Sequence, residues 1–210
     1  MNFPSPLLDG YGRFRAGRLE SERARYRRLA EAGQRPRTMI VGCCDSRAAP
    51  EIIFDAGPGQ LFVVRNVANL VPPYAPDGDY HGTSAALEFA VQVLEVETIL
   101  VLGHGRCGGI QAALSPEAPP LSPGDFIGRW MSLAERAARV LEKGGDGGED
   151  RQTALERLSV RLSIDNLRTF PFIADRERAG RLALHGAWFD IASGELWVLE
   201  PSTSEYRPAW

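Results

Sequence analysis

The chain has 210 residues, 44% of them hydrophobic and 24% charged, which suits one globular domain with a substantial core. Its formal net charge of −3 gives no electrostatic argument for a nucleic-acid partner. No window approaches the roughly 18 apolar residues of a membrane span, and the first residues lack the apolar core of a secretory signal. We therefore expect a cytoplasmic protein that binds neither nucleic acid nor membranes. Three cysteines, an odd number, favour metal binding or catalysis over a disulfide framework.

The N-terminal region predicts an exposed helical arm. Residues 18–33 carry charged side chains all round, which is typical of a helix that buries little surface, and Gly33 provides its end. We assign residues 1–35 to this arm and residues 36–210 to a single α/β domain.

Three short apolar runs predict buried strands. They are rich in β-branched residues and span residues 37–43, 59–66 and 97–104. A loop over 72–80 and an amphipathic helix over 81–96 separate the second strand from the third, with Thr83 or Ser84 near the helix cap. Strand, helix and strand joined by short connections predict a mostly parallel sheet covered by helices.

The second half of the chain predicts two helices and a hairpin. The helices span 126–143 and 151–170, and residues 181–201 form two alternating runs around Ala192–Gly194. The expected fold is therefore α/β, with a mostly parallel central sheet, an antiparallel C-terminal strand, flanking helices and the N-terminal arm.

Cysteine and histidine follow two of the predicted strands. Cys43 ends the first strand, and His104 ends the third, with Cys107 three residues later. Because the carboxyl ends of parallel strands form the sites of open α/β sheets, these side chains are expected to meet. Two thiolates and an imidazole favour zinc over harder cations, so we expect one zinc ion per chain.

The doublet at positions 43 and 44 raises the question of which cysteine is the ligand. In an extended segment, Cys43, Asp45 and Arg47 lie on one side, so Cys44 is expected to point away as a small buried residue. Arg47 would then keep Asp45 ionised through a bidentate pair.

Three protein ligands leave a fourth position for water, whose pKa a zinc ion lowers from 15.7 to about 7. This predicts a hydroxide nucleophile that Asp45 orients. The alternative is a structural zinc in which Asp45 itself fills the fourth position. Arg65 and Asn66, at the end of the second strand, are expected to hold neighbouring loops by hydrogen bonds.

The motif Cys43-x-Asp45-x-Arg47 followed by His104-x-x-Cys107 resembles the signature of the β-class carbonic anhydrases. The segments GQRP, FVVRNVANLVPPY, GTSAALEFAV, GHGRCGGI and DNLRTFPFI resemble the plant-like branch in order and spacing, over roughly residues 33–190. The resemblance implies a carbonic anhydrase that reversibly hydrates carbon dioxide to bicarbonate and a proton by attack of zinc-bound hydroxide. It also implies that Cys43, His104 and Cys107 hold the zinc, and that the N-terminal helices reach across a partner in a homodimer or a dimer of dimers.

The same resemblance suggests a substrate pocket. Gln34 matches a glutamine that donates a hydrogen bond to substrate, and the backbone amide of Gly108 matches one that approaches bicarbonate. Phe62 and Val67 match apolar pocket residues. Phe89 stands where plant-like members usually have tyrosine, so the hydrogen bond of that hydroxyl is absent or replaced.

Two other readings of the sequence stay open. The scaffold is also that of hydrolases of carbon disulfide or carbonyl sulfide, and a third candidate is a non-catalytic zinc-binding protein, against which Asp45, Arg47 and Gln34 argue. One branch of the family closes its zinc site with the aspartate and has a tryptophan three residues before the first cysteine ligand. Ile40 stands there in this chain, so we expect the open form.

Overall fold

The computed structural model describes residues 3–76, 81–114, 119–144 and 148–210, so the end of the expected 72–80 loop lies outside the described residues. The chain divides into two compact units, Met1–Arg35 and Pro36–Trp210. No helix among the described residues has the length and hydrophobicity of a membrane span.

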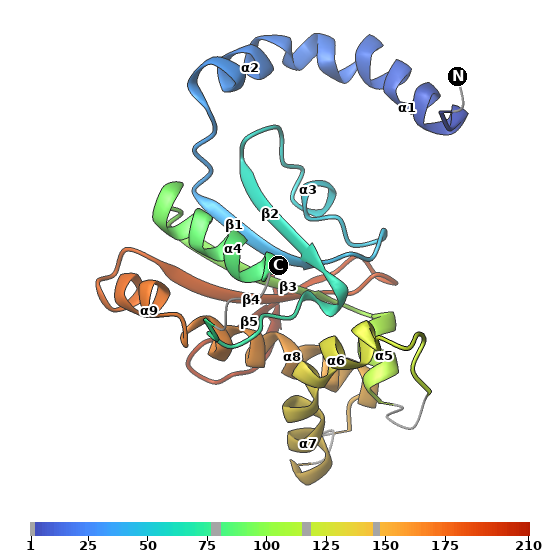
Figure 1. The fold of residues 1–210 in the computed structure, drawn as a ribbon, viewed down its shortest axis with the longest axis vertical. Helices are drawn as coiled ribbons and strands as arrows, with labels where there is room; N and C mark the ends of the chain where they lie inside the picture. The colour runs from blue at the N-terminus through green and yellow to red at the C-terminus, as the bar shows by residue number, and fades with distance from the viewer. Residues whose placement is uncertain (1–2, 77–80, 115–118, 145–147) are drawn as a thin grey trace. The chain divides into compact units, whose positions relative to one another are not determined.

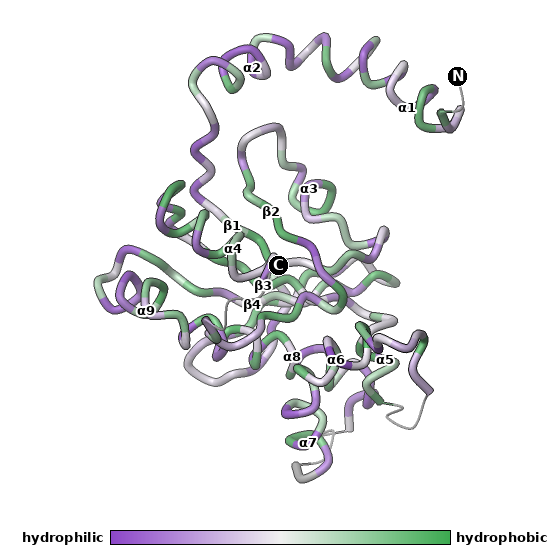
Figure 2. The backbone as a smooth tube through the Cα atoms, in the orientation of Figure 1, coloured by the Kyte–Doolittle hydropathy of each residue, from purple (hydrophilic) through white to green (hydrophobic). Residues whose placement is uncertain are grey.

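The N-terminal unit consists of two helices, α1 (Ser5–Ala16) and α2 (Arg18–Ala32). The predicted α2 ends at Gly33, which has a φ of 76° and adopts the left-handed region without steric cost. The sequence did not predict α1, whose ring of Phe14 lies 6.1 Å from that of Tyr26 on α2. No described residue of either helix is buried, and the trace of α2 is largely hydrophilic (Figure 2).

The second unit is built on a six-stranded sheet with the order β2-β1-β3-β4-β5-β6 (Figure 1). The first four strands in this order are parallel, and β5 and β6 continue the sheet antiparallel to their neighbours. The mostly parallel sheet is thus confirmed, and β6 extends it beyond the expected hairpin. The strands are β1 (Thr38–Cys43), β2 (Leu61–Asn66), β3 (Thr98–His104), β4 (Ala183–Phe189), β5 (Leu196–Leu199) and β6 (Tyr206–Pro208).

Helices connect the strands and cover the sheet (Figure 1). The predicted helix over 126–143 is interrupted by a 3-10 turn at Ser132–Ala134, and α4 continues into a π-helical segment at Phe89–Val93. The helices are α3 (Pro50–Ile53), α4 (Gly82–Glu88), α5 (Gly108–Ala113), α6 (Phe126–Met131), α7 (Glu135–Gly144), α8 (Arg151–Leu167) and α9 (Pro171–Arg178).

The expected cap of α4 was placed two or three residues too late. His81 occupies the N-cap position, and no side chain caps the helix. The hydroxyl of Thr83 instead accepts a hydrogen bond from Asn66 Nδ2 at 3.2 Å. The threonine therefore ties the start of α4 to the end of β2 rather than to its own helix.

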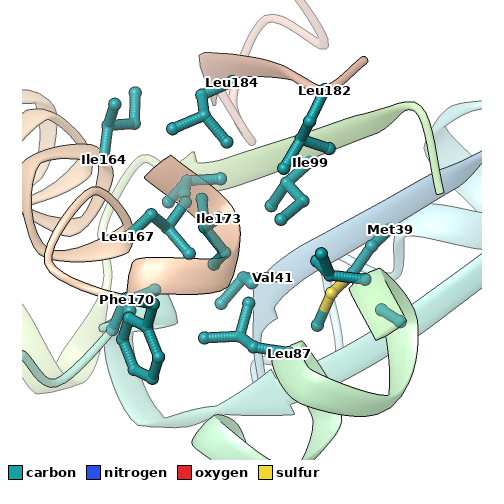
Figure 3. Close-up of a cluster of buried hydrophobic side chains, with 14 of the residues drawn as sticks. Met39, Val41, Leu87, Ile99, Ile164, Leu167, Phe170, Ile173, Leu182 and Leu184 are labelled. Atoms are coloured by element: carbon teal, nitrogen blue, oxygen red, sulfur yellow. The ribbon is translucent and has the colours of Figure 1, made fainter. Parts of the chain in front are cut away.

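Alternate side chains of the strands contribute to two apolar clusters on opposite faces of the sheet. On one face, Met39, Val41 and Ile99 pack against Leu87 of α4 and against residues of α8 and α9 (Figure 3). The opposite face, which includes Ile40 and Leu102, packs against Ile53 and Phe54 at α3. Each large aliphatic side chain that is fully buried in this way stabilises the fold by roughly 1.5–3 kcal/mol.

A third apolar cluster lies at the carboxyl ends of β1 and β3. Cys43 and Cys107 pack there with Ile110 of α5, Met131 of α6 and Leu155 of α8, among others. These helices give the two strand ends a rigid, water-excluding support.

Candidate metal centre

Two neighbouring parallel strands bring the three predicted ligands together. Cys43 is the last residue of β1 and His104 the last of β3, and the two strands pair in register along their length. Cys107 occupies the N-cap position of α5, after a short turn. All three side chains are buried, and one ligand atom from each lies within 4.8 Å of the others.

The geometry and chemistry of this group fit a zinc ion. The two sulfurs lie 4.0 Å apart, close to the separation of about 3.8 Å that a tetrahedral centre with 2.3 Å bonds to sulfur requires. The Nδ1 of His104 lies 2.9 Å from the carbonyl oxygen of Gly105. Its Nε2 is buried and has no hydrogen-bond partner among the described residues, so it is available as a ligand atom.

Interactions inside the group favour ionisation of a thiol. The hydrogen bond from Cys107 lowers the pKa of Cys43 to about 4, and the same contact together with burial raises the pKa of Cys107. The amide of Ala68 also donates to Cys43 Sγ at 3.3 Å. Burial lowers the pKa of His104, but the nearby Cys43 thiolate and the contact with the Gly105 carbonyl outweigh burial and raise it.

Asp45 and Arg47 form a bidentate pair beside the three ligands. Arg47 Nε donates to Oδ1 at 2.9 Å and Nη2 donates to Oδ2 at 2.7 Å. These hydrogen bonds hold the pKa of Asp45 well below its usual range. Oδ2 of Asp45 also lies 3.9 Å from His104 Nε2, so the ionised carboxylate borders the ligand group.

The cysteine doublet differs from its predicted geometry. The strand ends at Cys43, so the extended backbone that the alternation argument assumed does not continue to Arg47. A turn brings the pair together instead, and the backbone amide of Arg47 donates to Asp45 Oδ1 at 2.9 Å. The prediction that Cys44 is buried was wrong: its side chain is exposed, and it stands outside the ligand group.

Arg65 and Asn66 hold the surrounding loops, as the sequence suggested. Arg65 Nε donates to the carbonyl of Cys43 at 2.7 Å, and its Nη2 donates to the carbonyl of Asp45 at 2.6 Å. The side chain of Asn66 bridges both backbone groups of Leu70. The loop that carries Cys43 and Asp45 is therefore fixed from β2.

Two residues of α8, Gln152 and Glu156, contact the Cys107 loop and were not found from the sequence. Glu156 accepts a hydrogen bond from the Cys107 amide at 2.9 Å, and Gln152 Nε2 donates to the Cys107 carbonyl at 3.2 Å. The spacing of Gln152, Glu156, Ser159 and Ser163 places them on one face of α8, but the sequence does not distinguish this face from a solvated one, because α8 carries charged side chains elsewhere too. All four of these side chains are buried.

Of the expected pocket residues, the structure brings Gly108 and Val67 to the centre. Gly108 directly follows the Cys107 ligand, and a Cβ at Gly108 would meet no atom within 4 Å. Val67 Cγ1 lies 2.8 Å from a Cβ built on Gly109, so this side chain borders the start of α5. Gln34 belongs to the N-terminal unit, and its part in substrate binding stays a prediction.

Phe62 and Phe89 lie together but apart from the ligands of their own chain. Their ring centroids are 5.9 Å apart. Phe62 pairs with Met39, four residues before Cys43, which is about 13 Å along the strand. It packs on the cluster around Met39 rather than on the one that contains Cys43. Within one chain, these two rings do not form a wall of the metal centre.

Comparison with known proteins identifies the family of this chain. A family model described as carbonic anhydrase matches residues 38–196. Beta carbonic anhydrase 3 of Arabidopsis thaliana is 36% identical over 206 residues, covering 94% of this chain and 78% of the relative. This plant relative is consistent with the expected plant-like branch.

Solved structures show the same fold. The β-carbonic anhydrase CcaA has a TM-score of 0.90 at 30% identity, covering 98% of this chain and 92% of that one. A tetrameric β-carbonic anhydrase of the ascomycete Sordaria macrospora has a TM-score of 0.80 at 28% identity, covering 93% and 95%. The chain belongs to the β-class carbonic anhydrase family.

Proposed function

We propose that this protein catalyses the reversible hydration of carbon dioxide to bicarbonate and a proton, with one zinc ion held by Cys43, His104 and Cys107. The observation that carries the proposal is the convergence of these three buried ligands beside the Asp45–Arg47 pair. A purely structural zinc site has no need of an ionised carboxylate that is kept next to the metal and held by an arginine.

When bound, zinc lowers the pKa of a coordinated water to about 7 and so supplies the nucleophile that hydration requires at neutral pH. Three protein ligands leave one position for that water. Because the engagement of both Asp45 oxygens by Arg47 competes with metal ligation, it supports an open fourth position.

Asp45 then acts as a hydrogen-bond acceptor that orients the nucleophile. A carboxylate accepts but does not donate while it is ionised, and Arg47 keeps it in that state by lowering its pKa. Asp45 would therefore accept a hydrogen bond from the O–H of the nucleophile and so orient it toward the substrate carbon. Gly108 leaves the space beside the start of α5 free for substrate, since it has no side chain to fill it.

The rest of the pocket is proposed to come from a second copy of the chain, in a homodimer or a dimer of dimers. Phe62 lies about 13 Å along the sheet from the level of Cys43, and Phe89, whose ring lies beside that of Phe62, is 44% exposed. A partner's copies of these rings would complete an apolar wall suited to carbon dioxide, and Gln34 would supply a hydrogen-bond donor. The tetrameric relative from Sordaria macrospora supports self-association.

The N-terminal unit is proposed to contribute to this assembly. Leu7, Leu8 and Tyr11 on α1 are 45–61% exposed. Exposed apolar side chains that lie together on a helix often mark a surface that contacts another protein. The arm therefore has the composition expected of an interface element.

Stopped-flow measurement of carbon dioxide hydration, run beside assays of sulfide release from carbonyl sulfide and carbon disulfide, tests the proposed reaction. The expected result is hydration by zinc-loaded protein, with sulfide release slower by orders of magnitude. Faster turnover of either sulfur compound would assign the site to a hydrolase, and inactivity toward all three substrates with zinc bound would assign it to a structural metal.

A further inference from the structure

A buried carboxylate stands behind the Cys107 loop and faces three N–H donors. Glu156 of α8 is 1% exposed. Its Oε1 accepts from the Cys107 amide at 2.9 Å and from Gln152 Nε2 at 3.0 Å. Its Oε2 accepts from Trp188 Nε1 at 3.0 Å. Such a set of donors suits an ionised carboxylate, which accepts at both oxygens.

Burial of this carboxylate is costly unless all its hydrogen bonds are made. Burial raises the pKa of Glu156, and its hydrogen bonds with Cys107, Trp188 and Gln152 oppose that effect. An apolar side chain in its place would leave the buried N–H groups of Cys107 and Trp188 without this acceptor, which would cost stability as well. The network therefore fixes the backbone amide of Cys107 as well as filling space between α8 and the sheet.

The backbone on both sides of Cys107 is fixed by this network and its neighbours. Gln152 Nε2 donates to the Cys107 carbonyl at 3.2 Å, and Arg47 Nη2 donates to the Arg106 carbonyl at 3.1 Å. The Gly105 amide donates to the carbonyl of Phe189 on β4 at 2.8 Å. The turn between His104 and Cys107 is held from α8, β4 and the Asp45 loop at once.

The turn needs such support because its backbone is unfavourable. Arg106 has a φ of 56°, in the left-handed region that a non-glycine residue adopts at a cost. This conformation reverses the chain after His104 and returns Cys107 toward Cys43. Without its hydrogen bonds, the turn would relax and move Cys107 Sγ out of the ligand group.

We propose that Glu156 is a positioning residue of the metal centre, which holds Cys107 in its ligating position by accepting its amide hydrogen bond while anchored to Trp188 and Gln152. The inference rests on the proposed zinc site. Its consequence is that part of the zinc affinity resides in a residue that does not touch the metal. Loss of such outer contacts typically costs about 10- to 100-fold in metal affinity.

The test compares zinc affinity, measured by competition with a chromophoric chelator, between wild type and Glu156→Gln. Glutamine keeps the size of the side chain but presents an NH₂ group to N–H donors, so one hydrogen bond must break. We expect zinc affinity to fall by about 10- to 100-fold. Cobalt substituted for zinc should also show a shifted or weakened thiolate charge-transfer band, because the Cys107 sulfur is displaced.

Leu167→Ala is the matched control, because Leu167 is buried on the same helix but in the other apolar cluster. It should lower the melting temperature while zinc affinity stays within about twofold of wild type. If Glu156→Gln does not fold, the same measurements are made on Gln152→Ala. This substitution removes the hydrogen bonds that Gln152 Nε2 donates to Glu156 and to the Cys107 carbonyl.

Equal zinc affinity and an unchanged cobalt spectrum in the folded variant would overturn the inference, as would an equal loss of affinity in Leu167→Ala. Failure of the wild-type protein to bind zinc is a different result, which would overturn the proposed function itself.

Discussion

Arg47 engages both carboxylate oxygens of Asp45, with Nε 2.9 Å from Oδ1 and Nη2 2.7 Å from Oδ2. The same Nη2 donates to the Arg106 carbonyl at 3.1 Å. One guanidinium thus sets the state of the carboxylate and ties it to the turn that carries Cys107.

Replacement of Arg47 should lower activity without removing the metal. In Arg47→Ala, Asp45 loses its bidentate partner and is free to turn toward the metal. We expect hydration per bound zinc to fall at least about 10-fold. Arg168→Ala is the control, because it removes a partly exposed guanidinium that pairs with Glu177 rather than with Asp45. Equal rates per zinc in Arg47→Ala and wild type would contradict the role given to the pair.

Two adjacent glycines should respond differently to a methyl group. A Cβ at Gly109 would lie 2.8 Å from Val67 Cγ1 and 3.1 Å from the Cβ of Ala68, so Gly109→Ala should destabilise the fold by about 1–3 kcal/mol. A Cβ at Gly108 meets nothing within 4 Å. Gly108→Ala should leave the free energy of unfolding within about 0.5 kcal/mol yet lower kcat/KM, because the methyl enters the space assigned to substrate. Denaturant unfolding and hydration kinetics on both variants separate the two effects. Full activity in Gly108→Ala would show that substrate does not occupy the space beside Gly108.

We expect the buried side chain of Tyr206 to make the folded protein less stable in alkali. Burial raises the pKa of its hydroxyl above the ordinary value, and the hydroxyl donates to the Arg157 carbonyl at 3.0 Å. Above about pH 10 the unfolded chain ionises at this tyrosine while the folded chain does not. The contribution of Tyr206 to the free energy of unfolding is thus complete below pH 10. It declines by about 1.4 kcal/mol per pH unit as the pH rises toward the pKa of the tyrosine in the folded chain.

This slope can be measured as a difference. Tyr206→Phe should be less stable than wild type at pH 8, by about 1 kcal/mol for the lost hydrogen bond. Its free energy of unfolding should then fall less steeply between pH 10 and 11. Parallel curves for the two proteins would mean that Tyr206 ionises as freely in the folded chain as in the unfolded one.

Mixed dimers test whether a second copy completes the pocket. Phe62→Ala alone and Cys43→Ser alone should both impair hydration. If the aromatic wall comes from the partner, a dimer of one Cys43→Ser chain and one Phe62→Ala chain has one intact site. Such dimers, purified with two different tags, should then recover up to half of the wild-type activity. If they show no more than the Phe62→Ala homodimer, the wall belongs to its own chain.

The fold and the ligand set could be read from the sequence because their signals are local. Buried strands such as Thr38–Cys43 show as short β-branched runs, and the ends of parallel strands meet at one edge whatever the details of packing. The grouping of the three ligands therefore followed from residue types at the ends of two parallel strands. The Asp45–Arg47 pair was also predicted, although a turn rather than an extended strand creates it.

The parts that were missed depend on contacts between distant segments. Glu156 looks like an ordinary helix-surface residue until the Cys107 amide and the Trp188 indole are placed against it. Cys44 is exposed because the backbone turns after β1, which composition cannot show. Phe62 and Phe89 carry a pocket signature in the sequence, yet only the strand register shows that their own chain does not use them.

The most direct test of the account is the initial rate of carbon dioxide hydration at pH 8 or above, measured against zinc content. Wild-type protein should show a rate that rises in proportion to zinc, up to one ion per chain. Cys43→Ser should lose both metal and activity, and Asp45→Asn should keep the metal while its rate falls. Protein with one zinc per chain and no hydration above the uncatalysed rate would contradict the proposed function.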